Sequence, residues 1–223
     1  MSKFGAFERL IIRTVQCLNK TDIDYCIVGA IAASYYGSVR TTEDLDIIVD
    51  LSSNNPKQIK NLVSCLHSSD IDLIEKDMLQ GLLEKSHITA FDTHTYFYRV
   101  DFKGIYSSLD KLTMANKIKT RVLDDLDIWI TTPELQIIAK LLPGMRSDKD
   151  LSDIRYIFLN YKENIDFSVF LHKYDPDLVF NNELNDLVIN DFITKIKEIF
   201  PPKFIYSINK TTIYAIFEKT MIT

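Results

Sequence analysis

The chain has 223 residues, and its hydrophobic fraction of 46% and mean hydropathy of -0.03 are typical of a globular protein with a sizeable core. A net charge of -5 and a pI of about 5.4 argue against a protein whose main role is to coat DNA or RNA. No apolar run is long enough to span a bilayer and the first residues lack the pattern of a secretory signal, so we expect a cytoplasmic protein with no membrane association.

The first fifty residues predict a helix, a strand, a short helix and a second strand. Apolar residues recur at helical spacing over 4–19, which predicts an amphipathic helix. The apolar run 24–28 predicts a buried strand that ends at Gly29, and a short helix follows up to Gly37. Residues 44–50 alternate at first and then become wholly apolar, as a central strand does.

The middle of the chain continues this mixture of helices and strands. Helical patterns cover residues 56–66, roughly 73–85 and 109–118, and strand patterns cover 87–92, 95–104 and 126–130. The strands on either side of Asp92-Thr93-His94 predict a hairpin.

Only helical patterns follow the last of these strands. One helix is predicted over 132–142, with Pro133 in its first turn, and Ser147 is placed to cap the next. From about residue 161 the pattern is helical to the end. We therefore predict an α/β (α+β) fold in residues 1–160, with a mixed sheet flanked by helices, and a C-terminal helical region in residues 161–223.

The cysteines and histidines give no sign of a metal site or of a disulfide. Cys17, Cys26 and Cys65 are an odd number without paired spacing, and Cys26 lies in an apolar run where a buried thiol is expected. This usage favours a reducing compartment. The four histidines lack the spacing of zinc ligands.

Asp44 and Asp46 are the first residues that suggest chemistry. Residues two apart on a strand point to the same face, so the two carboxylates project together while Leu45 points the other way. Such a pair is costly in a dry environment but favourable when it binds Mg²⁺ or Mn²⁺. Gly29 allows close approach of the backbone to a ligand, and the helix after it directs N–H groups at an anion. An Asp-x-Asp pattern alone also occurs at solvated strand ends.

The combination of these features resembles a known superfamily. Val28-Gly29-Ala30, thirteen intervening residues and then Asp44-Leu45-Asp46-Ile47 resemble the signature of the DNA polymerase β-like nucleotidyltransferases. Within that superfamily, the stretch 28–49 is most similar to the abortive-infection toxins of the AbiEii family. The segment 140–154, "KLLPGMRSDKDLSDI", is similar to a later segment of the same family. The resemblance covers roughly residues 24–155.

The resemblance implies the polymerase β-like nucleotidyltransferase fold and a two-metal transfer of an NMP group from an NTP to an acceptor. Asp44 and Asp46 would be catalytic metal ligands, and the superfamily carries a third acid on a later strand. Asp101, between apolar neighbours, fits that role better than Asp92, which has the character of a turn residue. The alternative is that Asp101 merely ends a strand.

The resemblance also implies a set of nucleotide contacts. The predicted nucleotide-binding residues are Gly29, Ala30, Arg40, Thr42, Lys140, Arg146 and Lys149. Ala30 stands where the superfamily often has a serine that holds a triphosphate oxygen, which weakens the expected phosphate contact.

Each of these contacts has a structural alternative. Arg40 can pair with Asp44 or Glu43, and Thr42 can simply favour the entry into the strand. The basic residues of segment 140–154 can pair locally with its aspartates. Tyrosines 35, 36 and 98 can stack on a base, but packing in the core is the more common role of such residues.

The acceptor is left open by the sequence. The toxin resemblance implies a tRNA end or a protein hydroxyl as acceptor and an antitoxin protein as partner, in a toxin–antitoxin or phage-defence system. The acidic pI disfavours a large tRNA footprint, and a small-molecule acceptor uses the same chemistry. Two other hypotheses are a catalytically weak or inactive nucleotide-binding or partner-binding module of the same fold, and a helical adaptor whose function lies in residues 161–223.

Overall fold

The computed structural model describes residues 3–51, 55–123, 125–141 and 147–161. They fall into two compact units, the first within residues 1–35 and 40–132 and the second within residues 36–39 and from 133 onward. The predicted division at residue 160 stays a prediction, because residues 162–223 lie outside the described part of the chain.

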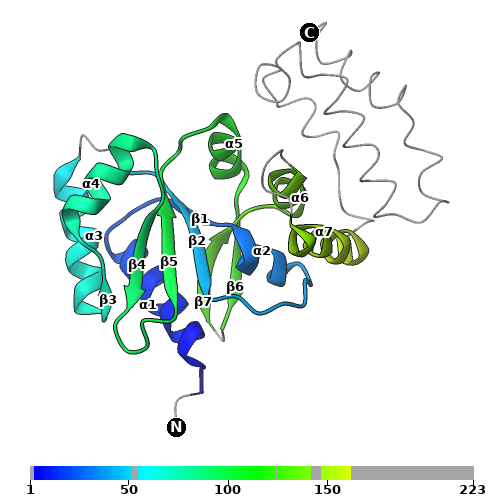
Figure 1. Cartoon of the computed structure of the whole chain (residues 1–223), viewed down its shortest axis with the longest axis horizontal. Coiled ribbons are helices and arrows are strands. Elements are labelled where there is room, and N and C mark those ends of the chain that lie inside the picture. The colour runs from blue at the N-terminus through cyan, green and yellow to red at the C-terminus, as the bar shows by residue number, and fades with distance from the viewer. Residues whose placement is uncertain (1–2, 52–54, 124, 142–146, 162–223) are drawn as a thin grey trace, which may run out of the picture. The chain divides into compact units, whose positions relative to one another are not determined.

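The first unit is built on a seven-stranded mixed sheet with the order β3-β4-β5-β2-β1-β7-β6 (Figure 1). The strands are β1 (Tyr25–Ile27), β2 (Asp44–Val49), β3 (Ile71–Asp72), β4 (Ile88–Asp92), β5 (Arg99–Lys103), β6 (Ile118–Val122) and β7 (Leu126–Ile130). Strand β2 runs parallel to β5 and antiparallel to β1, and β1 runs parallel to β7. The predicted mixed sheet is confirmed.

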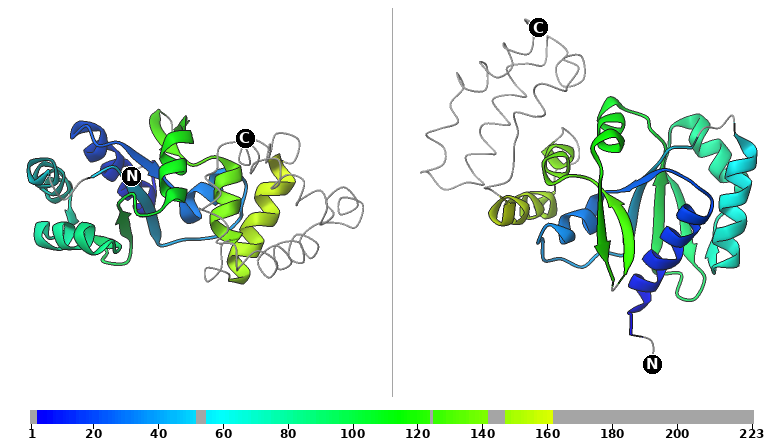
Figure 2. Two further views of the ribbon diagram at one scale, coloured as in Figure 1. Left: turned by 90° about the horizontal axis from the view of Figure 1, so that it is seen from above. Right: turned by 180° about the vertical axis from the view of Figure 1, so that it is seen from behind.

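Helices flank this sheet, as predicted. They are α1 (Ala6–Lys20), α2 (Gly29–Tyr35), α3 (Pro56–Ser68), α4 (Glu75–Glu84) and α5 (Ser108–Asn116). Helix α1 crosses one face of the sheet (Figure 2, right view) and packs against α3, which in turn packs against α4. Helix α3 begins where the sequence predicts, because the side chain of Asn55 accepts a hydrogen bond from the N–H of Gln58 and Pro56 occupies the first turn.

Two strands are absent from the prediction. The predicted helix 109–118 ends at Asn116, and Ile118 instead begins β6, which pairs with β7. Strand β6 lies at the end of the sheet and is largely exposed. It therefore lacks the alternation of buried and exposed residues that identifies a strand in a sequence. Strand β3 has only two residues, too few for any pattern.

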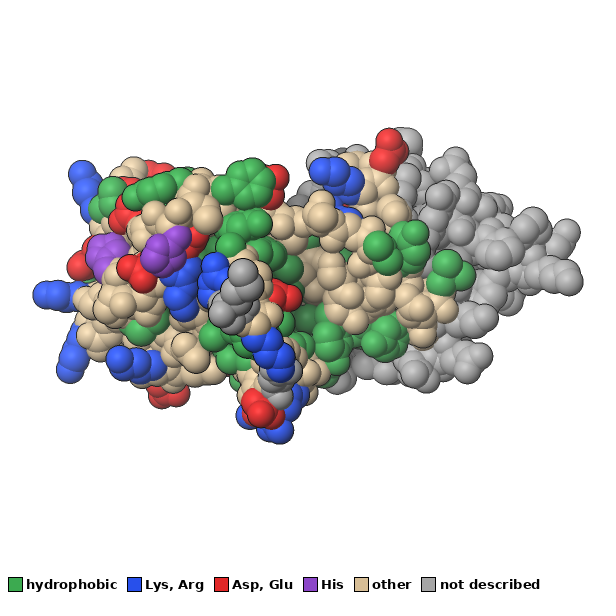
Figure 3. Space-filling model, turned by 90° about the horizontal axis from the view of Figure 1, so that it is seen from below, with side chains coloured by type: hydrophobic (Ala, Val, Ile, Leu, Met, Phe, Trp, Pro, Cys, Tyr) green, Lys and Arg blue, Asp and Glu red, His purple; other side chains and the backbone are tan. Residues whose placement is uncertain are grey.

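The surface of the first unit carries charges of both signs. On the face drawn in Figure 3, lysine and arginine side chains lie among acidic and apolar ones. Many pair locally, as in the β6–β7 hairpin, where Lys119 and Arg121 both contact Asp127, at 3.1 and 2.9 Å. None of the helices in the described ranges is long and apolar enough to cross a membrane.

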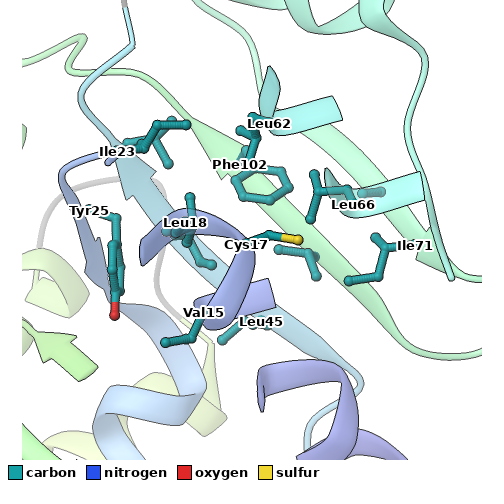
Figure 4. Close-up of a cluster of buried hydrophobic side chains, with 14 of the residues drawn as sticks. Val15, Cys17, Leu18, Ile23, Tyr25, Leu45, Leu62, Leu66, Ile71 and Phe102 are labelled. Atoms are coloured by element: carbon teal, nitrogen blue, oxygen red, sulfur yellow. The ribbon is translucent and has the colours of Figure 1, made fainter. Parts of the chain in front are cut away.

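The main core lies between the sheet and helices α1, α3 and α4. Leu18 of α1, Leu62 of α3 and the strand residues Tyr25, Leu45 and Phe102 are among its fully buried side chains (Figure 4). Burial of this size is the main favourable contribution to folding, at roughly 1.5–3 kcal/mol for each large side chain. Burial of Leu45 and Phe102 determines which face of β2 and β5 points into the core.

A smaller cluster covers part of the opposite face. Cys26 and Ile48 alternate with the residues of the main core and pack with Met114 of α5. Burial raises the pKa of the Cys26 thiol to about 12, so the thiol stays protonated at neutral pH. The predicted buried thiol at Cys26 is confirmed.

The second unit contains α6 (Pro133–Leu141) and α7 (Asp148–Tyr161), which pack together. Residues 36–39 also belong to this unit, and they contact α7. Gly37 has a φ of +98°, and a β-carbon there would lie 2.0 Å from Nδ2 of Asn160. Asn160 donates a hydrogen bond to the carbonyl of Tyr36 at 3.3 Å. Glycine fits this close approach because it has no side chain. Its positive φ is incompatible with a right-handed helix, so the short predicted helix ends before Gly37.

Cys17 of α1 and Cys65 of α3 form a disulfide. The odd number of cysteines and their spacing do not indicate this pair. The two residues are 48 apart in the chain, so no local spacing reveals the pair, and the packing of α1 on α3 brings their Cα atoms to 5.6 Å. The cysteine content consequently no longer favours a reducing compartment.

Reduction of the Cys17–Cys65 disulfide should lower the free energy of unfolding by about 3 kcal/mol, because it removes a crosslink from the unfolded chain. Urea unfolding with and without dithiothreitol measures the difference. The double variant C17S/C65S serves as the control, since its unfolding should not respond to dithiothreitol. Equal stability of the wild type under both conditions would contradict the crosslink.

Candidate active site

The predicted acidic residues lie together on one face of the sheet. In the parallel pair of β2 and β5, Asp44 lies opposite Arg99 and Asp46 lies opposite Asp101. Directly paired residues of neighbouring strands point to the same face. All four side chains are partly exposed, whereas Leu45 between the aspartates is fully buried in the core. The predicted common orientation of Asp44 and Asp46 is confirmed.

Gly29 lies at the junction of β1 and α2, directly against Asp46. Its φ is +65°, and a β-carbon there would lie 1.9 Å from Oδ2 of Asp46. The N–H of Val28 donates to the carbonyl of Asp46 at 3.0 Å. The close approach predicted for a ligand at Gly29 is therefore, in this structure, an approach to the carboxylate of Asp46. Ala30 is 2% exposed, so its methyl group packs in the interior.

Arg99 bridges two of the three carboxylates. Its Nη2 lies 2.8 Å from Oδ2 of Asp44, and its Nε lies 3.3 Å from Oδ2 of Asp101. On the other side, the hydroxyl of Thr89 on β4 donates to Oδ1 of Asp101 at 2.6 Å. Sequence reasoning missed Arg99 and Thr89. The usable signal was the spacing, because an arginine two residues before Asp101 on a strand shares its face.

The guanidinium of Arg99 keeps its positive charge between two carboxylates. Burial lowers its pKa, but the neighbouring charges of Asp44 and Asp101 raise it by more, so the pKa lies above the ordinary value and the guanidinium stays charged. A cation between two carboxylates offsets their repulsion. Arg99 thus supplies a positive charge between Asp44 of β2 and Asp101 of β5.

The three aspartates provide the donor set that a hard divalent cation prefers, which is carboxylate oxygen on a rigid support. Within the described residues, no three acidic, histidine or cysteine side chains converge on a metal position as they stand. Arg99 contacts two of the three carboxylates, those of Asp44 and Asp101. The residues fit a metal in kind, and Arg99 is the group that would have to move.

Asp92, the other candidate for the third acid, has a different environment. It lies on β4, on the same inward-pointing face as the core residues Ile88 and Ala90, and is 1% exposed. Arg13 of α1 contacts its Oδ1 at 2.5 Å, and the hydroxyl of Thr95 donates to its Oδ2 at 2.8 Å. Burial raises the pKa of Asp92, but these two partners lower it by more, to below the ordinary value. Asp92 therefore anchors α1 and the β4–β5 turn.

The nucleotide contacts predicted for Arg40 and Thr42, which precede β2, remain predictions. Thr42 accepts a hydrogen bond from the N–H of Asp44 at 3.3 Å, which is the strand-entry role expected as its alternative. Arg40 is half-buried in the same loop. Arg99, from the neighbouring strand, pairs with Asp44.

The predicted basic residues belong to the second unit. Nζ of Lys140 lies 2.8 Å from Asp150 and 2.6 Å from Asp153, and its side chain is 8% exposed. Local pairing, the structural alternative for Lys140, is therefore present. Lys149 is exposed in the first turn of α7, and Arg146 lies outside the described residues. Their contacts to a nucleotide stay predictions.

The three tyrosines have packing or hydrogen-bonding partners. Tyr36 is 2% exposed, and Tyr98 packs on Phe7 with ring centroids 5.1 Å apart. Tyr35 is 38% exposed, and its hydroxyl lies 2.7 Å from that of Thr120. The expected core packing holds for Tyr36 and Tyr98.

Comparison with solved structures identifies the fold. An antigenic nucleotidyltransferase-like protein from Paracoccidioides brasiliensis is 16% identical, with a TM-score of 0.51 over 96% of this chain and 94% of that protein. This chain has a nucleotidyltransferase fold. At this identity the likeness concerns the fold alone. The sequence matches no protein-family model and no curated protein sequence.

Two further structures have lower scores. A putative nucleotidyltransferase from H. pylori is 16% identical, with a TM-score of 0.45 over 96% of this chain and 95% of that one. ANT(2")-Ia in complex with adenylyl-2"-tobramycin is 12% identical, with a TM-score of 0.48 over 67% of this chain and 86% of that one.

Replacing Gly29 by alanine should destabilise the protein by about 2–4 kcal/mol, because the added methyl group overlaps Asp46 at a positive φ. D46A should lower the free energy of unfolding by at least about 1 kcal/mol less in the G29A variant than in the wild type, because it removes the overlapping carboxylate. Urea unfolding of the four proteins in this cycle gives the coupling. The control is G5A, where the nearest atom to a β-carbon is 3.6 Å away. Additive effects of G29A and D46A would contradict the contact.

The Asp92–Arg13 pair should make stability depend on pH. The folded-state pKa of Asp92 is lowered, so its contribution is present above its unfolded pKa of about 3.9 and is lost as the pH falls through the folded pKa. D92N should be less stable than the wild type by about 2 kcal/mol at pH 7, with the gap closing toward pH 2. Urea unfolding at pH 7, 4 and 2 measures the gap. A gap that does not change with pH would contradict this assignment.

Proposed function

We propose that this protein is a nucleotidyltransferase that transfers an NMP group from an NTP to a hydroxyl acceptor, with Mg²⁺ or Mn²⁺ as cofactor. The observation that carries the proposal is the placement of Asp44, Asp46 and Asp101 on one exposed face of neighbouring strands in a nucleotidyltransferase fold. Three carboxylates placed together in this way are the ligands that such chemistry requires.

The reaction assigns a role to each acid. Divalent ions bound by the three carboxylates supply charge neutralisation at the phosphates of the NTP. Asp101 is the proposed base, because two-metal transfer calls for a third carboxylate that assists deprotonation of the acceptor hydroxyl. The acceptor oxygen bonds to the α-phosphorus, its proton passes to Asp101, and the bond to pyrophosphate breaks. Asp44 and Asp46 hold position through the rigid β2 backbone, and Gly29 leaves the space that Asp46 occupies.

The proposed nucleotide contacts are the residues that the family resemblance implies. The N–H groups of Gly29 and Ala30, together with Arg40 and Thr42, are the proposed contacts from the first unit. Lys149, exposed on α7, and the predicted residues Lys140 and Arg146 are the proposed cations from the second unit. Arginine and lysine supply the countercharge that a triphosphate requires.

For the acceptor, the charge of the chain favours a protein hydroxyl over a tRNA end. Phosphate contacts provide most of the affinity for a polynucleotide, and this chain has a net charge of -5. The resemblance of residues 28–49 to abortive-infection toxins supports a role as the toxin of a toxin–antitoxin or phage-defence pair, with an antitoxin protein as partner.

A second candidate function is a nucleotide-binding or partner-binding module with weak or no catalysis. Two observations favour it. Ala30 provides no hydroxyl for a phosphate oxygen and is buried. Arg99 contacts two of the three carboxylates that a catalytic metal would need. A module of this kind would bind NTP without forming a labelled product.

Incubation with each α-³²P-labelled NTP, Mg²⁺ and a cell lysate should transfer label from one NTP to a macromolecule. D46N and D101N should each reduce the transfer at least about 100-fold, because each removes a charge that acts in the transition state. Digestion of the product with ribonuclease or protease identifies the acceptor class. The control D125N changes a side chain that is 87% exposed and should transfer label like the wild type.

Full labelling by D46N would contradict the assignment of the metal ligands. NTP binding by calorimetry without any labelled product would instead support the module.

A further inference from the structure

We propose that Arg99 is a built-in counter-cation of the three-carboxylate cluster, which a divalent cation must displace in order to bind. The cluster is defined as Asp44, Asp46 and Asp101. The inference rests on the proposed function, in that the cluster is taken as the metal site. It adds a positioning residue that sets the affinity of this site.

Arg99 contacts carboxylate oxygens of two of the three proposed metal ligands. It contacts Oδ2 of Asp44 at 2.8 Å and Oδ2 of Asp101 at 3.3 Å. The other oxygen of Asp101 accepts the hydroxyl of Thr89 at 2.6 Å. Both oxygens of Asp101 are thus already engaged by donors from this chain.

A counter-cation is needed in the metal-free protein. Asp46 and Asp101 are direct partners across parallel strands, and Asp44 is two residues from Asp46 on the same face. Carboxylates at such positions repel one another, and a cation between them offsets that repulsion. Arg99 removes this cost, so the exposed face of β2 and β5 can form before any metal arrives.

A guanidinium and a divalent cation cannot share these oxygens. Mg²⁺ and Mn²⁺ bind carboxylate oxygen at about 2.1 Å, and a guanidinium hydrogen-bonded to the same oxygens would lie a few ångströms from a double positive charge. Metal binding and the Arg99 bridge are therefore alternatives. The free energy of the bridge is subtracted from the free energy of metal binding.

The surroundings of Arg99 make its displacement inexpensive. Its side chain is 39% exposed and that of Asp44 is 33% exposed, so the ion pair between them is well hydrated and weak. Phe91 of β4 is the direct strand partner of Arg99 and is 41% exposed. A released guanidinium can stack on that ring or turn into water.

The test is calorimetric titration of Mn²⁺ into the nucleotide-free protein at low ionic strength. R99Q, which keeps a polar side chain without the charge, should bind Mn²⁺ at least fivefold more tightly than the wild type. R121Q is the matched control, because Arg121 is an exposed strand arginine that pairs with Asp127 on the β6–β7 hairpin. It should bind Mn²⁺ like the wild type.

Thermal unfolding gives a second readout that does not depend on activity. In EDTA, R99Q should melt at a lower temperature than the wild type, because its carboxylates lack a counter-charge. Saturating Mn²⁺ should close most of that gap. R99K keeps the charge but lacks the planar fork that bridges two carboxylates, so its affinity for Mn²⁺ should fall between those of wild type and R99Q.

The outcomes separate this proposal from the proposed function. Wild-type binding of Mn²⁺ with equal or weaker binding by both R99Q and R99K would overturn the role of Arg99 and leave the metal site intact. If folded wild type, R99Q and R99K all fail to bind Mn²⁺, the cluster is not a metal site and both proposals fall.

Discussion

Repulsion among three carboxylates on one face of a sheet is the constraint on which the rest of this site depends. Asp44, Asp46 and Asp101 occupy neighbouring positions on β2 and β5, and the strand register holds them there. A cation among the three carboxylates offsets this repulsion. In this structure the cation is Arg99. In the proposed function it is a divalent metal, so the same face would alternate between a structural and a catalytic state.

The core on the other face makes this arrangement rigid. Leu45 and Phe102 are fully buried on the same two strands that carry the aspartates, so a slip of either strand by one residue would bury charge. Gly29 adds a second restraint, because its lack of a side chain lets the β1–α2 junction lie against Asp46. Hydrophobic burial thus determines where the charges lie, and the charges determine what the exposed face can bind.

The sequence predicts those parts of the fold and site that have a local period. Alternation on a strand places Asp44 with Asp46 and opposite to Leu45. Features that depend on distant residues were missed. Arg99 meets Asp44 only because β5 pairs with β2, and Cys17 meets Cys65 only because α1 packs on α3. The exposed edge strand β6 and the two-residue β3 carry too little periodicity to be recognised.

The central claim is that this cluster binds divalent cations beside a bound NTP. Its most direct test is the anomalous scattering of Mn²⁺ in crystals grown with a non-hydrolysable NTP. The account predicts a peak in contact with Asp44, Asp46 and Asp101, with Arg99 turned away from the carboxylates. A bound nucleotide with no peak at this position, and with Arg99 still bridging Asp44 and Asp101, would contradict it.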